Sequence, residues 1–339
     1  MVISKACGYR TGCEGSYRYE QGVDVSREIW YEDKKLGGET MSILEVRPHL
    51  NLVGLKQKLD GLDRFISSWV YNGGLKFLVD VGPKASAHYL IDALKELGVN
   101  RLDFIFLTHI HIDHAGGTGA LIKHFPEARV VCHPAGISHL ISPQKLWEGS
   151  KKVLGEIALV YGEIDPVPAG NILSSDEFKT EGFELIKTPG HAAHHMSLVY
   201  DKYLFVGEAG GVFRNLGSQL YLRPSTPPRF ILEEAVASVD RLLELKDKEI
   251  CYAHFGIHPD SQEMLRRYRE QIYLWREVIA EQMEFPEGQD IIDRCITALL
   301  KNDPLFRSLI DMDEEERKRE FYFLANNIRG YLEYLAPSK

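Results

Sequence analysis

Thr108-His109-Ile110-His111-Ile112-Asp113-His114, directly after the apolar run Phe104-Ile105-Phe106-Leu107, is the segment from which the architecture of this chain can be inferred. Three histidines and one aspartate fall at offsets i, i+2, i+4 and i+5 from His109. This spacing does not match one face of a helix, where metal ligands recur at i and i+4. It matches a strand that ends in a turn, because alternation places His109 and His111 on one side and the turn brings Asp113 and His114 to the same point. Imidazoles combined with a carboxylate are the ligands of an open, catalytic zinc or iron site.

The composition is that of an ordinary globular protein with an acidic balance. Of 339 residues, 44% are hydrophobic and 26% are charged, and the formal net charge is −9. This charge argues against nucleic acid or an anionic membrane as a general partner. No apolar run approaches the ~18–20 residues of a membrane helix. The first ten residues also lack an apolar signal core, so we expect a cytoplasmic protein.

Cysteine usage agrees with a reducing compartment. The five cysteines are an odd number, are widely scattered and include no CxxC pair: Cys7, Cys13, Cys132, Cys251 and Cys295. A disulfide framework is therefore not expected. Cys7 and Cys13 are the only close pair, and we expect them to be free thiols.

Strand and helix signals alternate along the middle of the chain. Apolar runs predict strands at 43–46, 50–55, 65–71, 75–81, 104–108, 129–132, 184–188, 197–200, 203–206 and 249–252. Helices are predicted at 86–97, 121–125 and 230–245 and within 135–165, and 207–228 is predicted to be a Gly- and Pro-rich loop. This order indicates an α/β fold in which two mixed sheets pack together with helices outside.

The pattern of apolar and polar residues along the chain changes near residues 40 and 260. Residues 1–40 carry Gly and aromatic residues that show no clear helical or strand periodicity, and we expect them to form an amino-terminal extension. Residues 41–260 would form the α/β domain. From about Ser261 to Tyr334 the pattern is entirely helical, so 261–339 is expected to be a carboxy-terminal helical subdomain.

Each later strand of the predicted domain also ends at a candidate ligand, namely His191, Glu208 or His254. Here the sequence resembles the metallo-β-lactamase-fold hydrolase superfamily, including its glyoxalase II and lactonase branches. The matching motifs occur in the family's order: Leu78-Val-Asp80-Val-Gly82, Thr108-His109-Ile-His111-Ile-Asp113-His114-Ala-Gly-Gly117, Thr188-Pro-Gly-His191, Phe205-Val-Gly-Glu208 and Ala253-His254-Phe-Gly256.

The resemblance implies an αβ/βα sandwich that holds two divalent metal ions, with zinc expected and iron or manganese as alternatives. By motif position, His109, His111 and His191 would bind the first ion, and Asp113, His114 and His254 would bind the second. Asp80 would orient a ligand histidine, in agreement with the general role of groups behind metal ligands. His195 stands where relatives carry a residue that supports the site.

Glu208 departs from the family pattern, because relatives usually carry a bridging aspartate at this position. The extra methylene moves the carboxylate ~1.5 Å further from the backbone, one bond length. Glu208 would then either bridge both ions from a shifted backbone or bind only one. This residue therefore decides whether the second metal position is filled.

The expected chemistry is hydrolysis without a protein nucleophile. Two divalent ions ~3.5–4 Å apart lower the pKa of a shared water enough to hold hydroxide at neutral pH. Asp113 could carry a proton towards the leaving group. Four side chains near the predicted substrate entrance are candidate contacts for a carboxylate or phosphate: Arg214, Tyr221, Arg223 and Arg229.

We therefore expect a binuclear hydrolase that cleaves a thioester or lactone in a small-molecule substrate. One alternative is a mononuclear iron oxidoreductase similar to the persulfide dioxygenases of this fold, and another is a phosphodiesterase. The acidic charge argues against a nucleic-acid substrate. The carboxy-terminal helices could cap the active site or pack against a second subunit in a homodimer.

Overall fold

The computed structural model describes residues 33–36, 39–59, 61–62, 65–217, 219–246, 248–285 and 290–336. Cys7, Cys13 and most of the predicted extension lie outside these ranges. The three described cysteines, Cys132, Cys251 and Cys295, are buried free thiols. Within the described part of the chain, no helix combines the length and the apolar composition that crossing a membrane requires.

The larger sheet is built from the amino-terminal half of the chain. Its eight strands follow one another in sequence order: β1 (Asp33–Leu36), β2 (Glu39–Arg47), β3 (Leu50–Gly54), β4 (Ser67–Asn72), β5 (Lys76–Val79), β6 (Phe104–Phe106), β7 (Arg129–Cys132) and β8 (Ile172–Ser174). Strands β1 to β5 pair antiparallel, and β5 to β8 pair parallel. The expected boundary at residue 40 falls inside β2, and strands β1 and β8 were not predicted.

The smaller sheet has the order β15-β14-β11-β10-β9. Its strands are β9 (Phe183–Lys187), β10 (Met196–Tyr200), β11 (Tyr203–Gly207), β14 (Glu249–Tyr252) and β15 (Ile257–His258). The prediction of a continuous loop over 207–228 is wrong, because β12 (Val212–Asn215) and β13 (Leu220–Arg223) form a hairpin there. Each of these strands has only four residues, too few for the period-2 pattern to stand out between flanking Gly and Pro residues.

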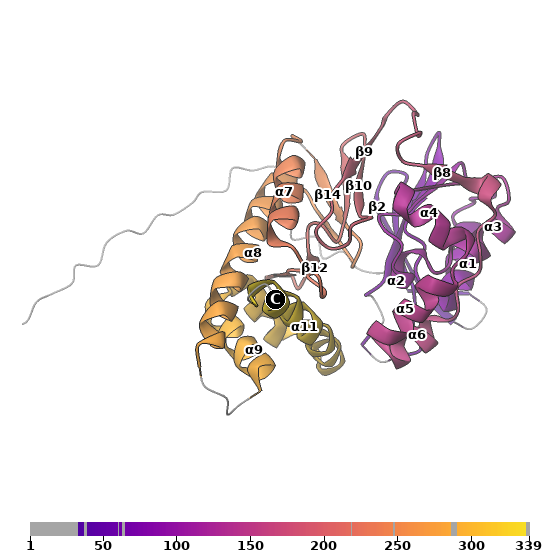
Figure 1. The fold of residues 1–339 in the computed structure, drawn as a ribbon. Coiled ribbons are helices and arrows are strands. Elements are labelled where there is room, and N and C mark those ends of the chain that lie inside the picture. The colour runs from indigo at the N-terminus through magenta and orange to yellow at the C-terminus, as the bar shows by residue number, and fades with distance from the viewer. Residues whose placement is uncertain are drawn as a thin grey trace, which may run out of the picture.

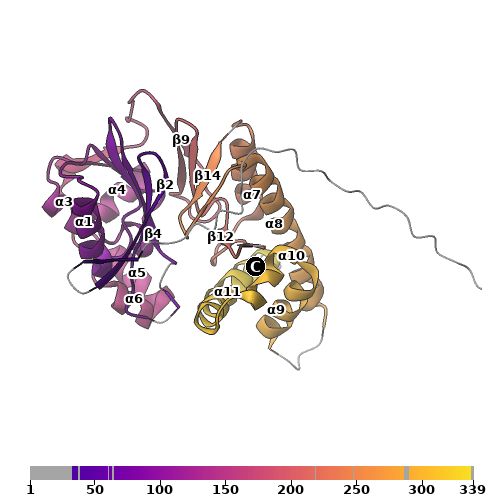
Figure 2. The same ribbon diagram turned by 180° about the vertical axis from the view of Figure 1, so that it is seen from behind.

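Helices cover the outer face of each sheet, so the chain forms four layers (Figures 1 and 2). The larger sheet is covered by helices of the amino-terminal half: α1 (Ala87–Glu96), α2 (Ile112–Ala115), α3 (Thr118–His124), α4 (Pro134–Ile141), α5 (Gln144–Leu154) and α6 (Glu156–Tyr161). The smaller sheet is covered by α7 (Leu232–Leu243) and α8 (Ser261–Met283). Three further helices, α9 (Ile291–Asn302), α10 (Pro304–Arg307) and α11 (Glu314–Leu335), pack on α8 and on the β12–β13 hairpin. Short 3₁₀ turns occur at Lys84–Ser86, Ala169–Asn171 and Ser308–Asp311. The predicted αβ/βα sandwich with carboxy-terminal helices is confirmed.

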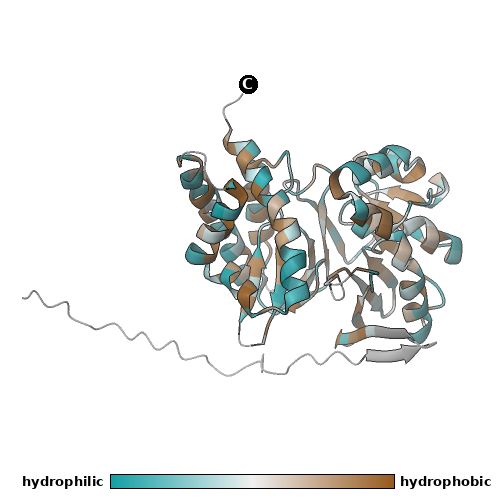
Figure 3. Ribbon diagram, turned by 90° about the horizontal axis from the view of Figure 1, so that it is seen from below, coloured by the Kyte–Doolittle hydropathy of each residue, from teal (hydrophilic) through white to brown (hydrophobic). Residues whose placement is uncertain are grey.

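The facing sides of the two sheets share a core of aromatic and aliphatic side chains. Trp69 and Phe77 of the larger sheet pack on Phe205 of the smaller sheet, with ring centroids 6.0 and 6.1 Å apart. Burial of one such side chain contributes roughly 1.5–3 kcal/mol. Figure 3 shows that the hydrophilic residues of the helices gather on the outward faces, away from the sheets. The sandwich thereby fixes the relative position of the strand ends, where the candidate ligands lie.

The carboxy-terminal helices begin at a well-defined residue. Asp260 is the N-cap of α8, and its carboxylate accepts a hydrogen bond from the backbone N–H of Glu263 at 2.9 Å. Apolar residues of α8, α9 and α11 belong to the same hydrophobic cluster as Leu204 and Ile250 of the smaller sheet. We propose that 261–336 is a subdomain packed onto the sandwich, since α8 contacts α7 and β13 and its apolar residues belong to the cluster of that sheet.

Candidate metal centre

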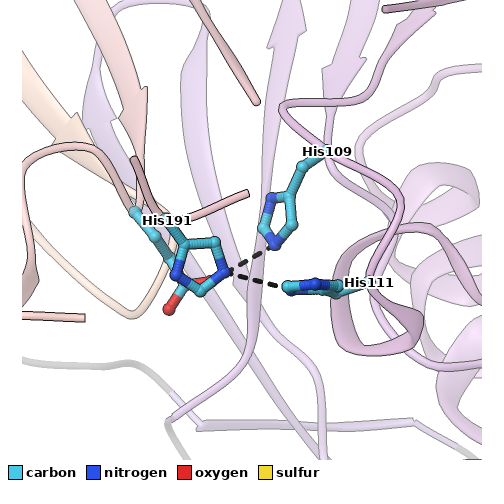
Figure 4. A group of neighbouring side chains, drawn as sticks. His109, His111 and His191 are labelled. Carbon is cyan, nitrogen blue, oxygen red and sulfur yellow. Dashed lines mark hydrogen bonds and ion pairs between the residues drawn. The ribbon is translucent and has the colours of Figure 1, made fainter. Parts of the chain in front are cut away.

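The predicted ligands meet at one edge of the sandwich, where strands of both sheets end. Two groups of side chains lie close enough to hold a metal ion. The first consists of His109, His111, His191 and Glu208, and the second of Asp113, His114 and His254, with the ligand atoms of each group within 4.8 Å of one another. Figure 4 shows the imidazoles of His109, His111 and His191 pointing towards one another.

Four of the imidazoles are each held in one orientation by a contact of the same kind. In each, the Nδ1 atom faces a protein oxygen: Thr108 Oγ1 for His109 (3.0 Å), Asp80 Oδ2 for His114 (3.0 Å), the Ser225 carbonyl for His191 (3.2 Å) and the Phe65 carbonyl for His254 (3.3 Å). Carbonyl and carboxylate oxygens only accept, and the Thr108 hydroxyl already donates to Asp80, so Nδ1 is the donor in each case. Nε2 is therefore the atom through which each of these four imidazoles would bind a cation.

The Nε2 atoms of His109 and His114 are fully buried and have no hydrogen-bond partner among the described residues. A buried polar atom without a partner costs about 1–3 kcal/mol, so native structures rarely contain one without a reason. A metal ion bound at each group would satisfy these atoms. The donor set of imidazoles and carboxylates fits the divalent metals expected from the sequence.

Glu208 lies between the two groups. Its Oε2 is 2.8 Å from His191 Nε2 and 3.4 Å from His114 Nε2, so one oxygen faces a ligand of each group. Its Oε1 is 3.3 Å from His254 Nε2 and accepts a hydrogen bond from the Ser225 hydroxyl at 2.7 Å. The longer side chain thus reaches both groups, which is the arrangement that a bridging carboxylate requires.

The backbone around Glu208 accommodates this longer side chain. The pairing of β11 with β14 shifts register between Phe205 and Gly207, and Gly207 has φ +60°. A Cβ at Gly207 would overlap His195 Nε2, which accepts a hydrogen bond from the backbone N–H of Glu208 at 3.0 Å. His195 Nδ1 in turn contacts the hydroxyl of Thr188 at 2.8 Å. His195, expected to support the site, therefore positions the backbone of Glu208.

Asp80 supports one histidine in each of the two ligand groups. Its carboxylate accepts hydrogen bonds from the backbone N–H and the hydroxyl of Thr108, both at 2.8 Å, and contacts His114 Nδ1 at 3.0 Å. Since the same hydroxyl faces His109 Nδ1, Asp80 orients one imidazole in each group. Asp80 has φ +57°, an uncommon conformation for a residue with a side chain.

Burial keeps His109 and His111 of the first group neutral. It is the largest cause that lowers the pKa of His109 and His111, and the neighbouring imidazoles of His114 and His191 lower these pKa values further. Metal ligands must be deprotonated to bind, so these two side chains are held in the competent form.

Glu208 of the first group and His114 of the second are instead shifted towards their charged forms. Burial acts to raise the pKa of Glu208, but the potential of His191 and His254 outweighs it and holds that pKa well below the usual range. Burial acts to lower the pKa of His114, but Asp113 and Asp80 outweigh it and raise that pKa. The centre therefore combines an ionised carboxylate with imidazoles in a water-poor edge of the sandwich, which favours a bound cation.

Ser225 is a site residue that the sequence did not reveal. Its hydroxyl faces Glu208, and its carbonyl faces His191. The segment around it is held by α11, because the Asn327 side chain accepts from the Thr226 backbone N–H at 3.1 Å and donates to the Pro224 carbonyl at 3.1 Å. Nothing in the local sequence marks this serine, whose role depends on a helix about a hundred residues further along the chain.

The four candidate substrate contacts have different positions. Arg214 pairs with Glu316 at 2.5 Å and lines a small cavity that His254 also lines, and Tyr221 lines the same cavity. Arg223 is only 2% exposed and, together with Tyr221, bonds to the buried Glu320 of α11. This burial argues against substrate contact by Arg223. Arg229 lies exposed in the turn before α7, where its backbone N–H donates to Glu333.

Comparison with known proteins gives the family. A family model described as the metallo-beta-lactamase superfamily matches residues 61–254. A metallo-beta-lactamase fold-containing protein of Sulfurisphaera tokodaii is 36% identical over 168 residues, which are 47% of this chain and 62% of that relative. A hydroxyacylglutathione hydrolase of Citrobacter koseri is 30% identical over 167 residues, which are 47% of this chain and 54% of that relative. The matches thus span little more than half of the length of these relatives.

A solved structure extends the likeness beyond the matched segment. The crystal structure of an archaeal metallo-beta-lactamase superfamily protein from Sulfolobus tokodaii superposes with a TM-score of 0.61 and 25% identity, covering 83% of this chain and 97% of that one. The matched residues 61–254 make up more than half of the 339 residues and contain all of the candidate ligands. This chain belongs to the metallo-beta-lactamase superfamily.

Proposed function

We propose that this protein is a binuclear metal-dependent hydrolase that cleaves an ester-like bond, with a thioester as the favoured substrate and a lactone as the next. The position of Glu208 is the observation that supports a binuclear centre, because its carboxylate faces His191 of one ligand group and His114 of the other. The thioester part is supported by the relatives named hydroxyacylglutathione hydrolase, such as that of Citrobacter koseri.

Zinc is the metal we propose, with iron and manganese as alternatives for the same donors. Divalent ions held by the two groups would supply Lewis acidity and a water activated for attack at neutral pH. The protein contributes the orientation: Asp80 holds one histidine of each group, and Ser225 holds His191 and Glu208. Such supporting hydrogen bonds keep ligands in place during turnover.

Asp113 is the residue we propose for proton transfer. Its side chain is 19% exposed, whereas that of His114 beside it is 1% exposed, so Asp113 is the more solvent-accessible of these two neighbouring ligands. A carboxylate at this position can take a proton from the attacking water and pass it to the leaving group. A thiol leaving group, with a pKa of about 8.5, departs as an anion more readily than an alcohol does.

The test combines metal content with a substrate panel. Purified protein would be analysed by mass spectrometry for bound metal and assayed with thioesters, lactones and phosphodiesters. We expect two divalent ions per chain and thioester turnover that a chelator abolishes. His109→Ala and His254→Ala, one from each ligand group, should lose both metal and activity, while His124→Ala, at an exposed position of α3, should retain both.

Two results would contradict this proposal in different ways. One iron per chain together with oxygen uptake on a persulfide would replace hydrolysis with the oxidoreductase alternative. Turnover of phosphodiesters without thioesters or lactones would keep the binuclear centre and replace the substrate class.

A further inference from the structure

Phe65 contacts His254, a candidate ligand of the second group, in two ways. Its backbone carbonyl faces His254 Nδ1 at 3.3 Å, which is the longest of the four contacts that orient the ligand imidazoles. Its ring is also stacked on that imidazole, with the ring centroids 4.3 Å apart and an interplanar angle of 19°. One residue therefore limits the rotation of the imidazole from its edge and from its face.

These contacts continue a series that joins β4 of the larger sheet to the end of β14 in the smaller sheet. Trp69 Nε1 donates to the Tyr252 carbonyl at 2.9 Å, and the Ser67 hydroxyl donates to the Ala253 carbonyl at 3.0 Å. Alternate residues of one segment thus contact successive residues of the other. Phe65 is the member of this series that lies outside β4, so the pairing of the strands does not hold it in place.

Helix α11 packs against the same phenylalanine. The guanidinium carbon of Arg319 lies over the Phe65 ring, 4.5 Å from its centroid, and the ring of Phe323 is stacked on it at 5.3 Å. Arg319 also donates to the Gly61 carbonyl at 2.6 Å. Phe65 is 4% exposed and Arg319 is 7% exposed, and a cation over an aromatic ring is held more strongly where water is excluded. Helix α11 therefore holds both the Phe65 ring and the backbone at Gly61.

The two histidines of the second group are thus oriented from different parts of the fold. His114 is oriented by Asp80, which follows β5 and accepts hydrogen bonds from Thr108 at the end of β6. His254 is oriented by Phe65, which α11 holds. A change in the packing of α11 on Phe65 would act on His254 and leave the support of His114 in place.

We propose that Phe65 is a positioning residue: held by α11, it keeps the His254 imidazole with Nε2 facing the second ligand group and thereby sets the affinity of this group for its metal ion. This inference rests on the proposed binuclear function. Loss of a group that orients a metal ligand typically weakens metal binding about 10–100-fold. Because such coupling is reciprocal, an ion at the second group in turn favours the contact of α11 with Phe65.

Phe65→Leu tests this role, and Phe230→Leu is its matched control. Phe65 and Phe230 are 4% and 3% exposed, and both rings pack against α11, Phe230 on Tyr331 at 4.8 Å. Zinc would be withdrawn from the zinc-loaded proteins with increasing chelator. We expect Phe65→Leu to bind one ion about tenfold more weakly, the ion that His254→Ala weakens most, and to hold the other ion as the wild type does. Phe230→Leu should hold both ions normally, although its melting temperature falls as that of Phe65→Leu does.

A second pair of variants tests the part played by α11. Phe323→Leu removes the ring of α11 that is stacked on Phe65, whereas Phe321→Leu changes a side chain of the same helix that is 40% exposed. Phe323→Leu should weaken the same zinc ion as Phe65→Leu, by a smaller factor because the carbonyl and the ring of Phe65 remain. Phe321→Leu should hold both ions as the wild type does.

A further measurement depends on neither metal affinity nor turnover. An aromatic ring shifts the proton resonances of an imidazole stacked on it, so histidine NMR spectra of the purified protein report this stack. Phe65→Leu should move the ring resonances of His254, which are assigned by their loss in His254→Ala. The resonances of His124, at an exposed position of α3, should stay where they are.

The outcomes separate this inference from the proposed function. A wild type that binds fewer than two zinc ions speaks against the proposed function, and the His254 resonances then decide the role of Phe65. Unchanged His254 resonances, or wild-type zinc affinities in Phe65→Leu, overturn the inference. Equal weakening of both ions, or the same weakening in Phe230→Leu, would assign Phe65 a general structural role and overturn it as well. Wild-type affinities in Phe323→Leu would remove α11 from it.

Discussion

Glu320 is a buried carboxylate whose loss should strongly destabilise this protein. It is fully buried in α11 and accepts hydrogen bonds from Tyr221 Oη at 2.7 Å, Arg223 Nε at 2.5 Å and Arg319 Nε at 3.1 Å. Arg319 also donates to the carbonyl of Gly61 at 2.6 Å. One carboxylate therefore ties α11 to the β12–β13 hairpin and, through Arg319, to the segment before β4. Glu320→Gln keeps the size of the side chain and removes its charge.

The magnitude follows from the pKa of this carboxyl group. Burial acts to raise the pKa of Glu320, but Arg223 and Arg319 outweigh it and lower the pKa from 4.5 to about 2. At about 1.4 kcal/mol per unit, this difference corresponds to about 3 kcal/mol of stability at neutral pH. The value agrees with the 3–5 kcal/mol that is typical when one partner of a buried ion pair is removed. We therefore expect Glu320→Gln to lower the free energy of unfolding by about 3 kcal/mol.

The assay is urea unfolding followed by circular dichroism, with the two proteins compared at several pH values. A carboxyl group whose pKa is lower in the folded state stabilises above its unfolded pKa and loses this effect as the pH falls. The difference between wild type and Glu320→Gln should thus be constant above about pH 5 and shrink as the pH falls from 4.5 towards 2.

Glu314→Gln serves as the control, because Glu314 pairs with Lys318 on the solvent side of the same helix. Its unfolding midpoint should match that of the wild type. A loss below about 1 kcal/mol for Glu320→Gln at pH 7, well under the range for buried pairs, would refute the reasoning. A loss that stays constant down to pH 2 would show that the charge is not its origin.

Three further substitutions test other parts of the structure. Asp80→Asn should weaken metal binding about 10–100-fold, measured by competition with a chelator, because it loosens one histidine of each group. Glu208→Gln should lower the metal content, measured by mass spectrometry, below that of the wild type, since its carboxylate faces both groups. Gly330→Ala should cost about 1–3 kcal/mol in urea unfolding, because its Cβ would overlap the carbonyl of Thr226, while Gly149→Ala, with open space around it, should stabilise by up to about 1 kcal/mol.

Local pattern predicted two mixed sheets with helices outside and pointed to histidines and carboxylates at the strand ends. The αβ/βα sandwich and the division of the candidate ligands into two groups came from the resemblance to a known family. The ligands follow the ends of apolar runs, as His109 follows β6, Glu208 follows β11 and His254 follows β14. A strand of alternating or continuous apolar residues can be identified within a few positions, and the polarity of consecutive strands brings their ends to one edge. The hairpin at 212–223 was missed because its short strands are stabilised by contacts with α8 and α10, not by their own pattern.

The sequence therefore indicated which residues are candidate ligands, but it did not indicate the contacts that support them. The length of the Glu208 side chain alone did not decide whether its carboxylate could face both ligand groups. The answer came from the register shift at Gly207 and from Ser225, which α11 holds in place. The role of Glu320 arises in the same way, from a helix that packs across the fold. Such contacts join segments far apart in sequence, so no local pattern encodes them, and only the packing of the helices on the sandwich brings them together.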